Sequence, residues 1–220
     1  MALKLAVLIS GRGSNLAAIL QAIDAGVCRA EVAIVVSDRA SAPGLELARD
    51  RGLPHYAVRP QDHADRAAWD HALADTVARV QPDLVVSAGF MRVLGANFLA
   101  RFPRRIINVH PSLLPLFPGI DAPAQAVASG MRLSGCSVHL VDAGVDTGPV
   151  IAQAALPIRP DDDASRLHAR IQRLEHVLLP RVVAAIADGG VVLAPELTVR
   201  TAPPQPESTL FSLGSPDGGP

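Results

Sequence analysis

The chain has 220 residues, of which 49% are apolar and 19% are charged, and its formal net charge is −1. This composition is typical of a globular protein with one substantial core, and it argues against a strongly basic nucleic-acid surface. The two cysteines, Cys28 and Cys136, lie far apart, and no apolar run reaches the ~18 residues of a membrane span. We therefore expect a cytoplasmic protein without a disulfide framework, a metal site or contacts with membrane or nucleic acid.

Four strands predicted in the first half of the chain are short apolar runs, at residues 4–10, 30–37, 82–89 and 105–110. Helical stretches are predicted among them, at residues 14–26, 42–52 and 64–80. Strands that are apolar throughout are typical of a parallel sheet that is covered on both faces. The order of these elements predicts an α/β fold with a doubly wound, mostly parallel twisted sheet flanked by helices.

The second half of the chain adds an antiparallel hairpin and a long helix. The strands of the hairpin are predicted at residues 135–142 and 148–156, and the helix at residues 163–190. We expect Pro180 to kink this helix or to end its first part, because proline lacks an amide hydrogen. Residues 191–199 are expected to add a short edge strand. Residues 1–200 are predicted to form a single domain, and the Pro-, Gly- and Ser-rich tail (201–220) to be largely disordered.

The stretch "VLISGRGSNL" (7–16) has the order strand, glycine turn, helix. Amide groups at a helix N-terminus carry partial positive charge and bind phosphate, so Gly13, Ser14 and Asn15 are candidate phosphate ligands. An ordinary strand-to-helix turn with helix capping explains the same residues. Asp38, after the second strand, stands where an acidic residue grips a ribose in dinucleotide sites. Ser-Asp at a strand end is also common turn chemistry, which makes this second signal the weaker one.

Asn108 and His110 lie at the end of a predicted parallel strand, where ligand crevices form. Two positions apart on a strand, they point to the same face. An amide donates to a developing oxyanion, and an imidazole moves protons near neutral pH. A His-Pro turn capped by asparagine is the structural alternative.

A carboxylate for this histidine is available in the predicted hairpin turn, "DAGVDTGPV" (142–150). Asp142 and Asp146 lie there, and a carboxylate beside an imidazole orients it and stabilises its charged form. Aspartates in turns more often serve only the backbone. We interpret His139, in the strand before this turn, as a packed residue rather than a catalytic one. An amide, an imidazole and a carboxylate together suit acyl or one-carbon transfer without a covalent enzyme intermediate.

Six segments together resemble the phosphoribosylglycinamide formyltransferases of de novo purine synthesis. They run in order from about residue 3 to residue 198: "VLISGRGSNL", "AGFMRVL", "INVHPSLLP", "FPG", "GCSVHLVDAGVDTGPVIAQ" and "RIQRLEHVLLP". The resemblance implies a Rossmann-like formyltransferase fold. It also implies transfer of the formyl group of 10-formyltetrahydrofolate to the amine of glycinamide ribonucleotide, by a monomer or homodimer that needs no metal.

The resemblance also implies which residues form the site. The catalytic residues would be Asn108, His110 and Asp146. The ribonucleotide would be bound by Gly13, Ser14, Asn15 and Glu175. The folate would be bound by Arg66, Met91, Arg92, Val93, Leu94 and Asn108. Taken alone, Glu175 and Arg66 can each also be interpreted as a surface charge of an amphipathic helix. The family usually has a histidine where this chain has Asp121, so we expect altered pH dependence or affinity rather than lost chemistry.

Other functions are compatible with parts of the pattern. Formyltetrahydrofolate hydrolase keeps a similar trio but has an extra N-terminal domain, whereas this chain begins at its first strand. Methionyl-tRNA formyltransferase has an added C-terminal domain and needs a basic surface. A nucleotide-binding module or NAD-dependent enzyme would explain the glycine turn but not the polar cluster. A catalytically silent regulator with this fold is a further alternative, which an assay of product formation would separate.

Overall fold

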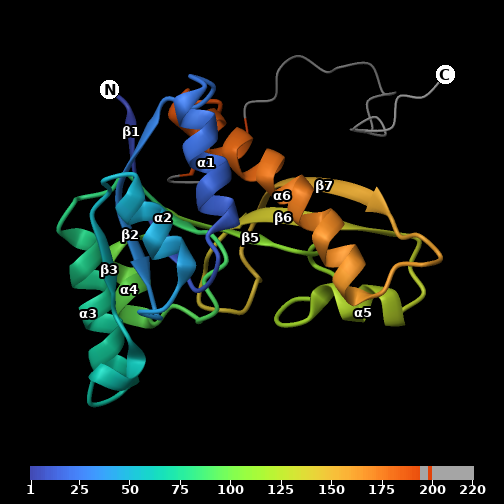
Figure 1. Cartoon of the computed structure of the whole chain (residues 1–220), viewed down its shortest axis with the longest axis horizontal. Coiled ribbons are helices and arrows are strands. Elements are labelled where there is room, and N and C mark those ends of the chain that lie inside the picture. Colours follow the sequence, from blue (N-terminus) through green and yellow to red (C-terminus); the bar gives the residue numbers. More distant parts are fainter. Residues whose placement is uncertain (194–197, 200–220) are drawn as a thin grey trace.

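The computed structural model, which describes residues 1–193 and 198–199, contains one central seven-stranded sheet (Figure 1). Its strands are β1 (Leu3–Ile9), β2 (Ala30–Ser37), β3 (His55–Ala57), β4 (Leu84–Ser87), β5 (Ile106–His110), β6 (Leu133–Leu140) and β7 (Val150–Pro157). Their order in the sheet is β3-β2-β1-β4-β5-β6-β7. The first five strands pair in parallel, and β6 and β7 are antiparallel. The predicted mostly parallel sheet with an added hairpin is confirmed.

Helices cover both faces of this sheet (Figure 1). One face carries α1 (Ser14–Asp24), α2 (Pro43–Asp50), α5 (Ala122–Ala128) and α6 (Ala164–Ala187), and the other carries α3 (Arg66–Ala78) and α4 (Ala96–Arg101). A 3₁₀ turn, η1 (Pro60–Asp62), precedes α3. Among the described residues, no helix is both long and apolar enough to cross a membrane.

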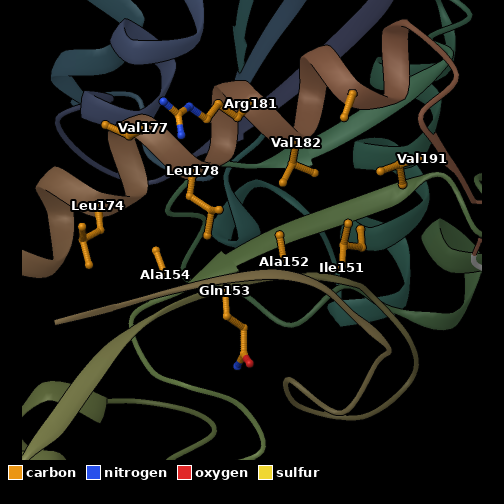
Figure 2. A pocket seen from close by; sticks show the side chains of 11 residues that line it. Ile151, Ala152, Gln153, Ala154, Leu174, Val177, Leu178, Arg181, Val182 and Val191 are labelled. Atoms are coloured by element: carbon orange, nitrogen blue, oxygen red, sulfur yellow. The ribbon is translucent and has the colours of Figure 1, made fainter. Parts of the chain in front are cut away.

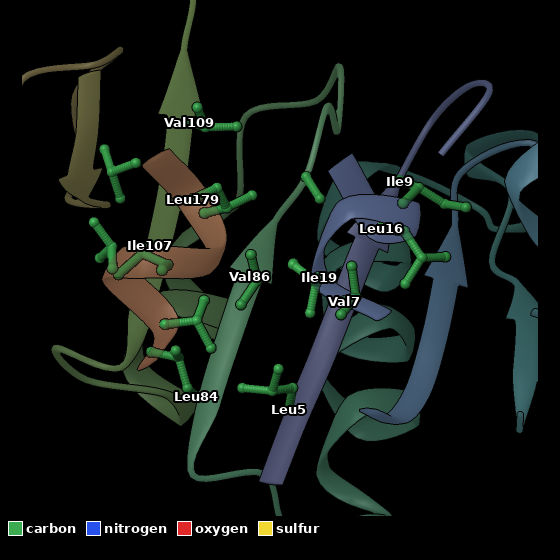
Figure 3. Close-up of a cluster of buried hydrophobic side chains, with 14 of the residues drawn as sticks. Leu5, Val7, Ile9, Leu16, Ile19, Leu84, Val86, Ile107, Val109 and Leu179 are labelled. Carbon is green, nitrogen blue, oxygen red and sulfur yellow. The ribbon is translucent and has the colours of Figure 1, made fainter. Parts of the chain in front are cut away.

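Strand β1 shows why its sequence is apolar at every position. Leu5, Val7 and Ile9 join the core under α1 and α6, and Ala6 and Leu8 join the core under α3 and α4. Figure 3 shows the first set pointing toward α1 and a turn of α6. Successive side chains of a strand point to opposite faces, so a strand covered on both sides has no position for a polar residue.

Three short elements were not predicted from the sequence: β3, α4 and α5. They have three, six and seven residues, which is too few for a hydrophobic period to stand out. The predicted long helix is α6, and it runs through Pro180 without a break. The expectation that Pro180 ends its first part is therefore wrong. Leu179, Val182 and Val183 are buried on both sides of this position, and their packing outweighs the amide hydrogen that proline removes.

The segment after α6 does not extend the central sheet. Its strands β8 (Val191–Val192) and β9 (Thr198–Val199) pair with each other in a separate two-stranded sheet. The predicted edge strand is therefore wrong, because these residues form their own ladder. The predicted tail (201–220) lies outside the described residues, and the single-domain assignment of residues 1–200 stays a prediction.

Candidate active site

Asn108 and His110 lie at the end of β5, and β6 runs beside them in the opposite direction. In this register Asn108 faces His139 across the two strands. The Nδ2 atom of Asn108 lies 3.2 Å from Nε2 of His139. His110 is buried, with 4% of its surface exposed. The predicted cluster at the strand end is thus present, and it includes a histidine that the sequence analysis left out.

Asp146 reaches this cluster from the loop between β6 and β7. Its Oδ2 atom lies 3.2 Å from Nδ1 of His110, and its Oδ1 atom accepts a hydrogen bond of 3.3 Å from Asn108 Nδ2. The N–H of Gly119 donates a bond of 2.8 Å to Oδ2. The backbone of Asp146 is left-handed, at φ 54°, which aspartate tolerates better than most residues. The structure therefore brings together the three residues predicted to be catalytic.

The contacts of Asp146 keep it ionised. Burial favours the neutral acid, but the contacts with His139, the Gly119 amide and His110 outweigh burial and lower the pKa of this carboxyl from 3.8. On the other side of His110, Nε2 lies 2.8 Å from the carbonyl oxygen of Phe117. Both ring nitrogens of His110 therefore face oxygen atoms, and these two contacts fix the orientation of the ring.

His139 is packed in the strand, as expected, with 1% of its surface exposed, and it also lies within the cluster. Its Nδ1 lies 2.8 Å from the carbonyl oxygen of Leu140 and its Nε2 lies 3.4 Å from Oδ1 of Asp146. A carbonyl oxygen only accepts, so Nδ1 carries a hydrogen and Nε2 is directed to Asn108 and Asp146. In the sequence, His139 lies in an apolar strand, where a histidine is most simply interpreted as packed. Only the register of β5 against β6 places His139 opposite Asn108.

The predicted phosphate turn lies at the start of α1. Gly13 precedes the helix with φ 74°, and Ser14 and Asn15 are its first two residues. A Cβ atom on Gly13 would lie 2.8 Å from the Cα of Gly44. Glycine is therefore required here by the close approach of two backbones as well as by its left-handed conformation. Phosphate binding at this turn stays a prediction.

Glu175, on α6, is buried and faces this turn. Only 4% of its surface is exposed, and Asn15 Nδ2 donates a hydrogen bond of 3.0 Å to its Oε2. Burial raises the pKa of Glu175, and the bond from Asn15 opposes that rise. The alternative interpretation, an exposed helix charge, is therefore wrong. Oδ1 of Asn15 is buried without a hydrogen-bond partner among the described residues.

The predicted folate segment, residues 91–94, follows β4. Met91 and Val93 are exposed and Leu94 is buried. Arg66 Nη2 donates to the carbonyl oxygen of Val93, and its guanidinium lies 4.8 Å from the ring centre of Trp69. Arg66 is therefore more than the surface charge that its helix pattern suggested.

Two acidic residues considered in the sequence lie outside the catalytic cluster. The side chain of Asp38 is fully buried, and its Oδ2 accepts a bond of 2.9 Å from Arg92 Nε. This pairing joins the end of β2 to the loop after β4, and ribose binding at Asp38 stays an untested alternative. Asp121 is exposed and precedes α5 with φ 57°, and its side chain does not cap that helix. It contributes no hydrogen bond to Asp146 or His110 in the described structure.

An apolar groove of about 270 Å³ lies elsewhere, between α6 and β7. Figure 2 shows Leu174, Leu178 and Val182 of α6 above Ala152 and Ala154 of β7. The groove shares no residue with the cluster around Asp146. Its lining contains no pair of acid and base, so it is not a candidate for the chemistry.

The comparisons with known proteins agree with this geometry. A family model described as formyl transferase matches residues 3–183. Phosphoribosylglycinamide formyltransferase of Mycobacterium tuberculosis is 47% identical over 190 residues, which cover 86% of this chain and 87% of that protein. The trifunctional purine biosynthetic protein adenosine-3 of Drosophila melanogaster is 43% identical over 89% of this chain, which spans only 15% of that longer protein.

Solved structures of phosphoribosylglycinamide formyltransferases also match this chain. Glycinamide ribonucleotide transformylase 1 from Symbiobacterium toebii matches with a TM-score of 0.86 at 43% identity, over 90% of this chain and 94% of that one. A phosphoribosylglycinamide formyltransferase structure from Coxiella burnetii matches with a TM-score of 0.84 at 37% identity, over 91% and 97% of the two chains. The chain belongs to the formyl transferase family, among its phosphoribosylglycinamide formyltransferases.

Proposed function

We propose that this chain transfers the formyl group of 10-formyltetrahydrofolate to the primary amine of glycinamide ribonucleotide. The products are formylglycinamide ribonucleotide and tetrahydrofolate, and the step belongs to de novo purine biosynthesis. The observation that carries the proposal is the convergence of Asn108, His110 and Asp146 within a formyltransferase fold. The names of the relatives that match over most of their length support formyl transfer to phosphoribosylglycinamide.

The folate supplies an activated one-carbon unit. The side chains of the cluster stabilise the negative charge that develops on it and accept a proton from the amine. The amine attacks the formyl carbon, a C–N bond forms, and the carbonyl oxygen becomes negatively charged. Asn108 Nδ2 donates a hydrogen bond to that oxygen in place of its bond to Asp146, and His110 Nε2 donates in place of its contact with the carbonyl oxygen of Phe117. Asp146 accepts a proton from the attacking amine, directly or through water. The bond between the carbon and N10 of the folate then breaks, and N10 takes up a proton.

The contacts within the cluster suit these roles. The contacts of Asp146 lower its pKa, so its carboxylate is ionised at neutral pH and orients the His110 ring through Nδ1. The carbonyl oxygen of Phe117 holds the other side of the His110 ring, which fixes the direction of its N–H groups.

The substrates are assigned to two sides of this cluster. The phosphate of the ribonucleotide binds the amides of Gly13, Ser14 and Asn15, and Glu175 binds its glycinamide or ribose part. The folate binds along residues 91–94, with Arg66 beside it. The buried Asn15–Glu175 contact supports the first assignment, because it joins the phosphate turn to α6. The exposed side chains of Met91 and Val93 support the second.

The cellular setting is part of the proposal. Cys28 and Cys136 are buried free thiols, which fits a reducing cytoplasm. The proposed chemistry uses side chains and the folate alone. Light scattering of the purified chain decides between the monomer and the homodimer expected from the sequence.

Formation of tetrahydrofolate from 10-formyltetrahydrofolate, followed by absorbance, tests the proposed function. We expect product only when glycinamide ribonucleotide is present, and formylglycinamide ribonucleotide in equal amount by mass spectrometry. Release of formate at the same rate without the ribonucleotide would instead identify a hydrolase. The Asp146→Asn variant, measured in parallel, shows whether the activity belongs to this cluster.

A further inference from the structure

The loop between β4 and α4 is held in place by side chains from other elements. At its first half, the N–H of Met91 donates a bond of 2.8 Å to Oγ of Ser10, at the end of β1. Arg92 Nε donates a bond of 2.9 Å to Oδ2 of Asp38, at the end of β2. Two neighbouring strands of the sheet therefore set the position of residues 91 and 92.

The second half of the loop is held by α3. Arg66 donates to the carbonyl oxygen of Val93. Asp70, one helical turn later, accepts a bond of 2.7 Å from the N–H of Gly95 and one of 3.0 Å from the N–H of Phe98. Residues four apart on a helix lie on the same side, so one face of α3 holds both ends of residues 93–95.

Two charged residues of α3 hold the loop, Arg66 and Asp70, and Asp70 is the buried one. Only 2% of its surface is exposed, and each carboxylate oxygen accepts one backbone N–H. Gly95, the residue before α4, has no side chain with which to cap that helix, and Asp70 provides the cap from another element. A Cβ atom at position 95 would lie 2.5 Å from the Asp70 carboxylate. Glycine at 95 is thus matched to this carboxylate.

The loop displays apolar side chains although its backbone is held. Met91 is 69% exposed and Val93 51% exposed, while Leu94 between the anchors is buried. Exposed apolar groups on a fixed backbone form a ready surface for a flat ring, because no conformational freedom of the backbone is lost on binding. The anchors therefore affect binding without touching the ligand.

We propose that Asp70 is a positioning residue for folate binding: its buried carboxylate fixes the backbone of Gly95 and the start of α4, and so the end of the loop that receives the pterin ring. This inference rests on the proposed function in one respect, namely that the loop binds folate. Within the part of the chain that the structure describes, the side-chain hydrogen bonds of Asp70 go to the loop and to the start of α4. Its removal should therefore weaken folate binding and leave the ribonucleotide site, built from α1 and α6, unchanged.

Titration calorimetry with two separate ligands tests this inference. The variant Asp70→Asn keeps the shape of the side chain, but its amide group cannot accept one of the two backbone N–H bonds. We expect its Kd for tetrahydrofolate to rise about tenfold, or about 1.4 kcal/mol, with the Kd for glycinamide ribonucleotide unchanged. Asp75→Asn, at an exposed position of the same helix, is the matched control and should change neither constant.

A second variant tests the same contact from the loop side. Gly95→Ala leaves Asp70 in place but pushes a methyl group against its carboxylate, and we expect the same selective loss of tetrahydrofolate binding. This variant decides the question if Asp70→Asn fails to fold. Unchanged tetrahydrofolate binding in the folded variants would overturn the inference, as would an equal loss for both ligands.

The outcomes also separate this inference from the proposed function. If the wild-type chain binds tetrahydrofolate but does not formylate the ribonucleotide, the proposed function is wrong, and the Kd values of the variants alone decide the role of Asp70. If the wild-type chain does not bind tetrahydrofolate, both are wrong.

Discussion

Asn108 and His139 lie opposite each other on the antiparallel strands β5 and β6, with Nδ2 of the first 3.2 Å from Nε2 of the second. Both side chains also reach the same oxygen of Asp146, at 3.3 Å and 3.4 Å. His110 contacts the other oxygen of that carboxylate. The polar cluster therefore has four members, and Asp146 is the residue that all of the others contact.

Replacing Asp146 by asparagine should lower kcat by about 10²–10⁴-fold, the range typical of a lost acid–base group. The variant removes the charge that pairs with His110 and the acceptor for the amine proton. Thermal unfolding should show a folded protein, because asparagine fits the same space and tolerates the left-handed backbone at φ 54°. A rate close to that of the wild type would contradict the catalytic assignment. Asp75→Asn controls for the loss of a negative charge.

Replacing His139 by leucine should shift the acid side of the pH profile of kcat/KM to higher pH. Burial raises the pKa of Asp146, and the contact with His139 is the largest of the effects that lower it. Without that contact the pKa rises, so the carboxylate is lost by protonation at a higher pH than in the wild type. His139→Gln, which returns an amide N–H toward Asp146, should reverse part of the shift. If the acid limb of His139→Leu lay at the same pH as that of the wild type, His139 would not control the pKa of this carboxylate.

Replacing Glu175 by glutamine should stabilise the protein at neutral pH while weakening its binding of the ribonucleotide. The pKa of buried Glu175 is raised in the folded state, above the value of about 4.3 expected in the unfolded chain. The folded protein therefore binds this proton more tightly, and its stability falls as the pH rises from about 4.3 through the folded pKa. Glutamine keeps the contact with Asn15 without the buried charge.

Urea unfolding at several pH values measures this effect. The difference in unfolding free energy between Glu175→Gln and the wild type should be positive at pH 7 and should disappear below about pH 4, where the wild-type carboxyl is neutral in both states. The KM for glycinamide ribonucleotide should rise about tenfold, as expected for a lost hydrogen bond to a charged group. A variant that is less stable at pH 7 would argue against the raised pKa.

Replacing Gly13 by alanine should destabilise the fold more than replacing Gly26 by alanine. Both glycines have a left-handed backbone, at φ 74° and 71°, so both variants carry the cost of φ strain, about 1 kcal/mol or more. Only at Gly13 does the new methyl group also meet the backbone of Gly44, whereas Gly26 has open space around it. Denaturant unfolding of the two variants measures the difference, which is the contribution of the close approach. Equal losses would show that Gly13 is required for its conformation alone.

The sequence predicted the long elements well and the short ones poorly. Continuous apolar runs identified β1, β2, β4 and β5, since a strand covered on both faces has no polar positions. The elements β3, α4 and α5 were missed because a few residues carry no measurable period. Pro180 does not end the first part of α6, one of the two effects expected of it, because the packing of Leu179 and Val183 on the sheet keeps the helix continuous.

Sequence alone determined that the chain forms a mostly parallel sheet and that Asn108 and His110 stand at the end of one of its strands, because strand periodicity and side-chain direction are local properties. Tertiary structure decided which distant side chains meet them. His139 and Asp146 lie 31 and 38 positions from Asn108, and Glu175 lies 160 positions from Asn15. Strand register and the docking of α6 bring these pairs together. Those arrangements depend on the burial of whole faces, which no short stretch of sequence encodes by itself.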